Sequence, residues 1–202
     1  LAPIIILGVV LAVFQQWCGI NVIFNYAEEV FSAAGYGISS TLFNIVLTGS
    51  VSLIFTIISM FMVDRWGRKA LMLTGAGGLA IVYVIISAGY FLEVKGVFMV
   101  FWVVTAISIY SLTLAPVTWV LLSEIFPNKV RGHAMSVATL ALWFSCLILT
   151  ISFPLLNKAL STSGTFGIYA AICIIGFIYI RRKLPETKGK SLEQIERELT
   201  GK

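Results

Sequence analysis

The chain of 202 residues is 59% hydrophobic and 11% charged, with a mean hydropathy of +0.99. Soluble domains carry about 25% charged residues, so this composition excludes an ordinary soluble domain and indicates an integral membrane protein. The formal net charge of +5 is no sign of nucleic-acid binding, because the Lys and Arg residues collect beside the apolar segments.

Apolar stretches long enough to cross about 30 Å of hydrocarbon recur along the chain, and we predict that all of them are helices. The six predicted spans cover residues 4–26, 41–63, 70–92, 97–122, 133–156 and 165–181. They form one predicted transmembrane unit, residues 1–183. Residues 184–202 form a predicted tail with a short amphipathic helix, which begins at a capping box of Ser191 and Gln194.

The distribution of basic residues predicts the orientation of these spans. An even number of spans puts both ends of the chain on one side of the membrane. Twelve of the 14 Lys and Arg residues fall on that side, and only Lys95 and Lys158 fall on the other. Because cytoplasmic segments carry the excess of Lys and Arg, we predict a multi-pass protein of the cell membrane with both ends cytoplasmic. The start at Leu1 rather than Met suggests a piece of a longer protein.

Four carboxamides, Gln15, Gln16, Asn21 and Asn25, interrupt the first span. A carboxamide that faces lipid is costly, so we expect these groups to face a protein or water-filled interior. On a straight helix of about 100° per residue, Gln16 and Asn21 would point about 140° apart. An unwound turn at Gly19 would gather them, and broken membrane helices mark binding sites in transporters. The alternative is that each amide only bonds a neighbouring helix.

The loop after the second span reads Asp64-Arg65-Trp66-Gly67-Arg68-Lys69. A positive-inside anchor is its ordinary interpretation, but that explains neither the acid nor the glycine. An aspartate beside two arginines can join helix ends by charge-assisted hydrogen bonds. The loop after the fourth span has a similar character, with Glu124 and Arg131 seven residues apart.

Two tryptophans in the later spans are candidate ligand contacts. Pro116 removes a backbone donor and is expected to bend the fourth span. Trp119 shares the face of Pro116 and lies inside the span, where it is either a stacking surface for a ligand or a core residue. Trp143 lies in the fifth span. With a single histidine and no paired cysteine spacing, we propose no metal site, catalytic residue or cofactor.

Five motifs carry a family resemblance. In chain order they are Gln-Gln-x-x-Gly-Ile-Asn from Gln15, Asp-Arg-x-Gly-Arg-Lys from Asp64, Pro-Val-x-Trp from Pro116, Ser-Glu-Ile-Phe-Pro from Ser123 with Arg131-Gly following, and Pro-Glu-Thr-Lys-Gly from Pro185. The order of these motifs resembles the C-terminal half of the sugar porter family of the major facilitator superfamily. The residues within the motifs are most similar to those of bacterial xylose–proton symporters. The resemblance implies an all-α membrane protein whose six transmembrane helices are helices seven to twelve of a transporter built from inverted repeats.

The resemblance also implies roles for single residues. Gln15, Gln16 and Asn21 match sugar-binding amides, while Asn25 stands where a gating tyrosine is common. Trp119 and Trp143 match tryptophans at the sugar site. The residues that match a cytoplasmic charge network, which holds the outward-facing state closed below, are Asp64, Arg65, Gly67, Arg68, Glu124, Arg131 and Glu186.

We therefore expect a transporter of a pentose or hexose that works by alternating access, with an N-terminal six-helix half, the bilayer and protons as its partners. Apart from Arg181 at the last position of the sixth, no predicted span contains Asp, Glu, Lys or Arg, so a symporter would carry its coupling residue in the other half. The alternatives are a facilitative uniporter, a non-transporting membrane sensor and a truncated, inactive fragment. An enzyme is disfavoured, because these loops supply no nucleophile–base pair.

Overall fold

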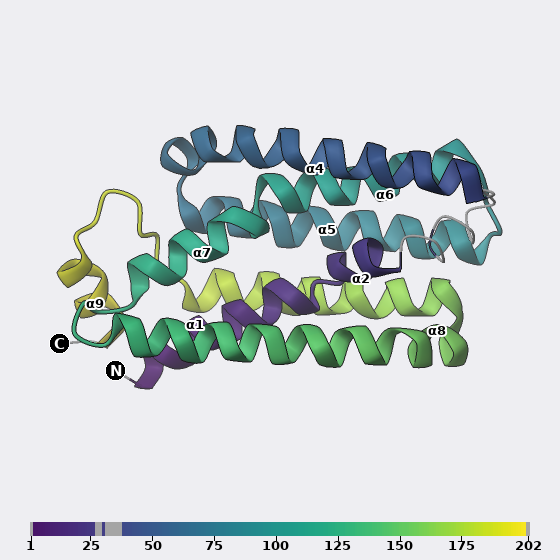
Figure 1. The fold of residues 1–202 in the computed structure, drawn as a ribbon. Coiled ribbons are helices and arrows are strands. Elements are labelled where there is room, and N and C mark those ends of the chain that lie inside the picture. Colours follow the sequence, from purple (N-terminus) through teal and green to yellow (C-terminus); the bar gives the residue numbers. More distant parts are fainter. Residues whose placement is uncertain (1, 27–29, 31–37, 201–202) are drawn as a thin grey trace.

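The computed structural model describes residues 2–26, 30 and 38–200 of the chain. Every regular element in these residues is a helix, in agreement with the predicted all-α class. Figure 1 shows them as a bundle of long helices that run in two opposite directions. The helices are α1 (Ala2–Trp17), α2 (Ile20–Asn25), α4 (Ile38–Trp66), α5 (Arg68–Phe91), α6 (Val97–Leu112), α7 (Leu114–Ile125), α8 (Arg131–Lys183) and α9 (Leu192–Thr200).

Five helical segments of the described residues are long and apolar enough to cross a membrane, and the last of them is α8. This helix has 53 residues and leaves the helical conformation at Ser161 (φ 63°, ψ 172°). In Figure 1 its ribbon doubles back, so that residues 131–160 and 162–183 form two antiparallel arms. The predicted spans 133–156 and 165–181 lie on separate arms. The count of six spans stays a prediction.

Two of the long segments are broken near the middle of the bundle. Gly19 separates α1 from α2 and has a left-handed conformation (φ 88°, ψ −7°). Thr113 separates α6 from α7 and has φ −121° and ψ −84°. The first break lies where the spacing of the carboxamides required an unwound turn. The second lies three residues before Pro116, whose missing N–H weakens the backbone ladder of the preceding turn.

At each break a glycine lets two helices approach each other closely. A methyl group added at Gly19 would lie 2.6 Å from the ring of Tyr169, on the second arm of α8. A methyl group added at Gly75 of α5 would overlap the hydroxyl of Thr113 at the other break. Because interiors are close-packed, these contacts leave no room for a larger residue, and neighbouring helices fix the position of both breaks.

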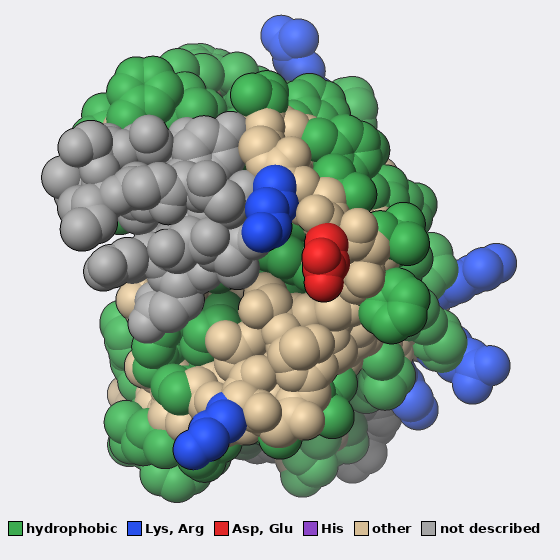
Figure 2. Space-filling view, turned by 90° about the vertical axis from the view of Figure 1, so that its right-hand side faces the viewer, with side chains coloured by type: hydrophobic (Ala, Val, Ile, Leu, Met, Phe, Trp, Pro, Cys, Tyr) green, Lys and Arg blue, Asp and Glu red, His purple; other side chains and the backbone are tan. Residues whose placement is uncertain are grey.

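The two ends of the bundle differ in charge. The connections α4–α5, α7–α8 and α8–α9 all lie at one end, which we call the basic end (Figure 1). Lys95 and Lys158 belong to the opposite end. Figure 2 looks onto that opposite end and shows charged side chains scattered over the part of it that the structure describes. The cytoplasmic location of the basic end stays a prediction from the Lys and Arg count.

The predicted tail helix is present as α9. The backbone N–H of Ser191 donates to Gln194 Oε1 (2.9 Å), and the N–H of Gln194 donates to Ser191 Oγ (3.3 Å), which are the two bonds of a capping box. Ile195 is buried, and α9 packs against α1 and α7. The tail therefore covers part of the basic end.

Candidate functional site

The break at Gly19 sets the direction of the carboxamides around it. The Cys18 N–H still donates to Phe14 O (2.8 Å), as in a helix, whereas the Gly19 N–H makes a longer bond to Gln16 O (3.4 Å). Helix α2 then restarts on a new path, and its first turn is closed by Val22 N–H to Gly19 O (3.1 Å). A positive φ is readily adopted only by glycine, so the turn depends on this residue.

Gln16 and Asn21 form a pair across the break. Gln16 is buried at 7% exposure and Asn21 is half-buried. Asn21 Nδ2 donates to Gln16 Oε1. A carboxamide offers two donors and one acceptor oxygen, so this bond leaves the Gln16 amino group and the Asn21 oxygen for another partner. The unwound turn at Gly19 thus brings Gln16 and Asn21 together, as the sequence predicts.

Gln15 points to a different neighbour. Its side chain is 3% exposed, and Nε2 donates to the backbone carbonyls of Leu114 (3.4 Å) and Ala115 (3.1 Å) in the first turn of α7. The Gln15 Oε1 atom is buried without a hydrogen-bond partner among the described residues. One side of this amide therefore holds α1 to α7, and the other side is an acceptor in need of a donor.

Asn25 contacts a different helix from the other amides. It is exposed, and its Nδ2 donates to Thr150 Oγ1 (3.4 Å) on the first arm of α8. The neighbouring Tyr26 hydroxyl donates to Thr150 O (2.8 Å), and the Tyr26 ring lies 4.7 Å from that of Phe153. These contacts fasten the end of α2 to α8. Neither Tyr26 nor Thr150 was among the predicted site residues, because local sequence gives no sign of a pairing between residues more than a hundred positions apart.

The two candidate tryptophans are partly open on the surface of the described chain. Trp119 of α7 is 39% exposed and Trp143 of α8 is 64% exposed. Trp143 lines a surface hollow of about 710 Å³ together with Thr139, Leu140 and Leu147. Pro116 lies in the first turn of α7, close to the carbonyls that Gln15 binds. Both rings are therefore free to meet another surface or a ligand.

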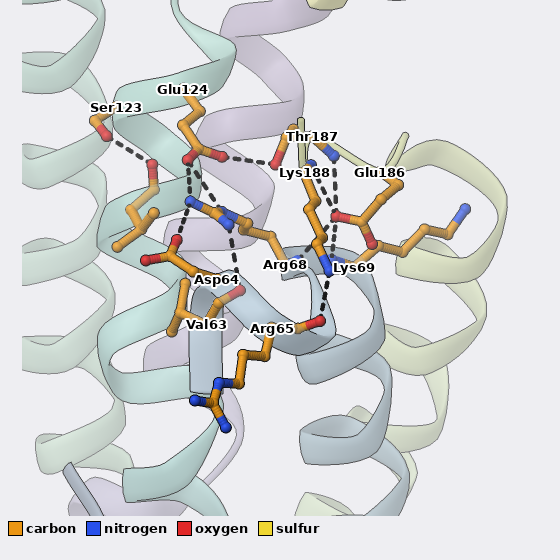
Figure 3. Close-up of polar contacts among 11 residues, drawn as sticks. Val63, Asp64, Arg65, Arg68, Lys69, Ser123, Glu124, Glu186, Thr187 and Lys188 are labelled. Atoms are coloured by element: carbon orange, nitrogen blue, oxygen red, sulfur yellow. Dashed lines mark hydrogen bonds and ion pairs between the residues drawn. The ribbon is translucent and has the colours of Figure 1, made fainter. Parts of the chain in front are cut away.

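A second polar cluster, which we call the latch, lies at the basic end (Figure 3). Arg68 at the start of α5 is its centre. Arg68 Nη2 lies 3.0 Å from Asp64 Oδ1 and 2.8 Å from Glu124 Oε1, and Nε donates to Glu124 Oε1 at 3.0 Å. Nη1 donates to the Val63 carbonyl (3.2 Å). Because the Arg68 side chain is only 13% exposed, its charge depends on these partners.

Glu186 completes the latch by capping α5 from a distant segment. Its Oε1 accepts the backbone N–H groups of Arg68 (2.9 Å) and Lys69 (3.5 Å), which have no partner inside their own helix. The negative charge also suits a helix N-terminus. A methyl group at Gly67 would lie within 3.0 Å of the carboxylate, and the φ of Gly67 is 89°. Glycine at this position therefore admits the cap.

The latch differs in membership from the predicted charge network. The structure brings together Asp64, Gly67, Arg68, Glu124 and Glu186. It adds Thr187, whose hydroxyl donates to Glu124 Oε2 (2.6 Å). Thr187 belongs to the Pro-Glu-Thr-Lys-Gly motif, but the motif alone does not predict this bond.

Two predicted members of the network stand apart from the latch. Arg65 contributes its backbone carbonyl, which accepts Lys188 Nζ, while its guanidinium points away in Figure 3. Arg131 donates from Nε to Phe126 O (3.3 Å), and its Nη2 is buried without a partner among the described residues. Neither side chain bonds the acids of the latch within the described part of the chain.

Comparisons with known proteins agree on one group. A family model described as "Sugar (and other) transporter" matches residues 2–199. The chain is 33% identical over 199 residues to the D-xylose-proton symporter of Escherichia coli (strain K12), covering 96% of this chain and 40% of that protein. It is 35% identical over 199 residues to the glucose facilitated diffusion protein of Zymomonas mobilis subsp. mobilis (96% and 42%). It is 34% identical over 194 residues to the arabinose-proton symporter of Bacillus subtilis (96% and 42%).

Solved structures with a similar fold are also sugar transporters. The proton:xylose symporter XylE bound to 6-bromo-6-deoxy-D-glucose matches with a TM-score of 0.88 and 33% identity over 96% of this chain and 42% of that one. The inward-open form of the xylose transporter from E. coli matches with a TM-score of 0.88 over 97% and 42%. The chain thus spans about two fifths of the length of the curated relatives it matches, and the aligned part is their C-terminal half.

Proposed function

We propose that this chain, which belongs to the sugar porter family of the major facilitator superfamily, carries a monosaccharide across the membrane by alternating access. Members of this family are transporters rather than enzymes. The relatives named above handle xylose, glucose and arabinose, so a pentose or a hexose is the proposed substrate. The proposed working unit also contains an N-terminal six-helix half, because the chain corresponds to only part of its relatives.

The observation that carries the proposal is the set of three carboxamides beside the break, which we call the amide cluster: Gln15, bonded to α7, and the pair of Gln16 and Asn21. A sugar hydroxyl both donates and accepts hydrogen bonds, and a carboxamide is the side chain that offers both functions without charge. The Gln15 oxygen is buried and has no partner within the described part of the chain, and the Gln16–Asn21 pair keeps further donors and acceptors. The exposed rings of Trp119 and Trp143 supply apolar faces for a sugar ring. Asn25, which bonds Thr150, is proposed as a contact at the edge of the site.

Alternating access requires that the two ends of the transporter open in turn. We propose that the latch closes the basic end, which we predict from the Lys and Arg count to be cytoplasmic. The contacts of α2 with α8 through Tyr26 and Thr150 would close the opposite end. The two sets of contacts bias the populations of the outward- and inward-facing states.

Replacing Gln16 or Asn21 by alanine in the full transporter is expected to weaken sugar binding by about 1–3 kcal/mol, the cost of leaving hydrogen-bonding partners unpaired. Equilibrium binding of D-xylose, D-glucose and L-arabinose to the purified protein measures this loss. The matched control is Ser50→Ala, an exposed α4 residue whose one hydrogen bond among the described residues runs from its hydroxyl to Val46 O of the same helix. Unchanged sugar affinity combined with loss of folded protein would mean that the amides only hold the bundle together.

We further propose that a proton, if one is coupled, is carried by the other half of the transporter. The carboxylates of the described residues lie at helix ends, in connections or in the tail, and a coupling group must change its environment within the membrane. In vesicles that contain the full transporter, sugar-driven proton uptake should disappear when the membrane carboxylates of the N-terminal half are neutralised. Proton uptake that persists would place the coupling in this half. A full transporter without proton uptake would be a facilitator, like the Zymomonas mobilis relative.

A further inference from the structure

Gln15 contacts both helix breaks. Its amide nitrogen donates to the carbonyls of Leu114 and Ala115, directly after the break at Thr113. Its backbone carbonyl accepts a hydrogen bond from Cys18 Sγ (3.0 Å), directly before the break at Gly19. The two contacts join parts of the chain that are 100 positions apart. In Figure 1 both breaks lie in the middle part of the bundle, where α1 passes α7.

The unpaired oxygen of Gln15 separates it from an ordinary packing amide. Amides that hold membrane helices together normally satisfy their polar atoms within the bundle. Gln15 is 3% exposed, and its Oε1 has no hydrogen-bond partner among the described residues. A buried acceptor without a partner is costly, and a hydroxyl donated by a ligand removes that cost. The planar amide would then connect the ligand with the first turn of α7.

From these contacts we infer that Gln15 is a positioning residue that couples movement of α2 to movement of α7 when sugar binds. This inference rests on the proposed function. A sugar hydroxyl that donates to Oε1 fixes the amide plane, and the amide nitrogen in turn fixes the Leu114 and Ala115 carbonyls. Hydrogen bonds in such a chain polarise and strengthen one another. Gln16 and Asn21 bind sugar without this link to α7.

The route from Gln15 to both ends of the bundle is short. Helix α7 runs from the break at Thr113 to the basic end, where its Glu124 accepts hydrogen bonds from Arg68 and Thr187 of the latch. Helix α2 runs from the break at Gly19 towards the contact between Tyr26 and Thr150. A residue that ties the start of α7 to the end of α1 therefore connects the closures at the two ends.

The test uses the full transporter with a fluorescent noncanonical amino acid at Phe24 of α2 or at Ser123 of α7, both exposed positions. In the parent protein, D-xylose or D-glucose should change both signals over the same concentration range. Gln15→Met removes the amide with little change in length. At saturating sugar the α2 signal should remain, while the equilibrium constant of the α7 change, obtained from its signal, falls at least about fivefold, the lower range of allosteric coupling factors. The maximal transport rate should fall more than the apparent sugar affinity.

Gln16→Met is the matched control, because it removes a neighbouring amide that has no contact with α7 among the described contacts. It should lower sugar affinity and leave the two signals changing together at saturation. If Gln15→Met fails to fold, Gln15→Asn serves instead, since it keeps the amide but is one methylene shorter than the side chain that reaches the Leu114 and Ala115 carbonyls. An α7 signal that follows the α2 signal as in the parent, in either Gln15 variant, overturns the inference.

A sugar-free experiment separates this inference from the proposed function. Failure of the parent protein to bind any tested sugar would refute the proposed substrate class alone. Coupling is then measured with Arg68→Gln, which disturbs α7 from the basic end. The α2 signal should shift in this variant and stay unchanged when Gln15→Met is added. The inferred coupling role of Gln15 is overturned if the α2 signal does not change in Arg68→Gln, or if it shifts equally with and without Gln15.

Discussion

Replacing Gly19 by alanine is expected to destabilise the protein by about 2–5 kcal/mol. Two costs add up to this value. A left-handed backbone costs a residue with a Cβ roughly 1–2 kcal/mol, and Gly19 has a φ of 88°. Overfilling a packed site costs about 1–3 kcal/mol, and the new methyl group would lie 2.6–2.9 Å from the atoms of Tyr169. The measurement is the free energy of unfolding in detergent, together with sugar affinity.

Gly49→Ala is the matched control for this prediction. Gly49 lies within α4, and a methyl group added there has no neighbour within 4 Å. Alanine is favoured over glycine in a helix interior by about 1 kcal/mol, so this variant should be neutral or slightly stabilising. Equal stabilities of the two variants would contradict the assigned conformation of Gly19.

A double-mutant cycle separates the two costs at Gly19. Combining Gly19→Ala with Tyr169→Ala removes the two ring contacts, at 2.6 and 2.8 Å, and retains both the backbone strain and the contact with Tyr169 Cβ at 2.9 Å. The coupling between the two changes should therefore fall in the range of about 0.5–3 kcal/mol that contacting residues show. Additive effects would mean that Tyr169 does not support the break.

The break at Gly19 could be predicted because local sequence carried its signal. Gln16 and Asn21 cannot share a face on a straight helix, and a glycine stands between them. The position of the second break was harder to predict, because Pro116 removes a hydrogen bond from the turn that precedes the proline. The sequence predicts a bend at Pro116, whereas the backbone departs from helical geometry at Thr113.

The partners of single polar side chains could not be predicted from local sequence. Arg65 and Arg68 stand in the same loop, and composition does not distinguish them. The turn at Gly67 makes Arg65 the end of α4 and Arg68 the start of α5, so that only Arg68 reaches Glu124. The bond from Gln15 to Ala115 depends in the same way on how α1 crosses α7. Family motifs identify such residues as a group, and the fold decides which of them meet.

The last prediction concerns the latch, where neutralising Arg68 should shift the transporter towards inward-open forms. Arg68→Gln removes the ion pairs to Asp64 and Glu124 and the bond to the Val63 carbonyl. Glu124, whose side chain is 24% exposed, then keeps only Thr187 among its described partners. Hydrogen bonds to charged groups contribute roughly 1.5–3 kcal/mol each. Losing one such contribution changes a two-state equilibrium by about tenfold or more.

Accessibility of cysteine probes at the basic end measures this shift, with sugar affinity and transport rate measured on the same samples. Transport should fall more than binding, because the amide cluster is untouched while the cycle loses one of its closed states. The control is Arg65→Gln. It removes the same charge three positions before Arg68, and the Arg65 side chain points out of the latch (Figure 3). Equal probe accessibility in the parent, Arg68→Gln and Arg65→Gln proteins would refute the proposed role of the latch. A matching shift in both variants would instead restore Arg65 to the network that the sequence alone predicted.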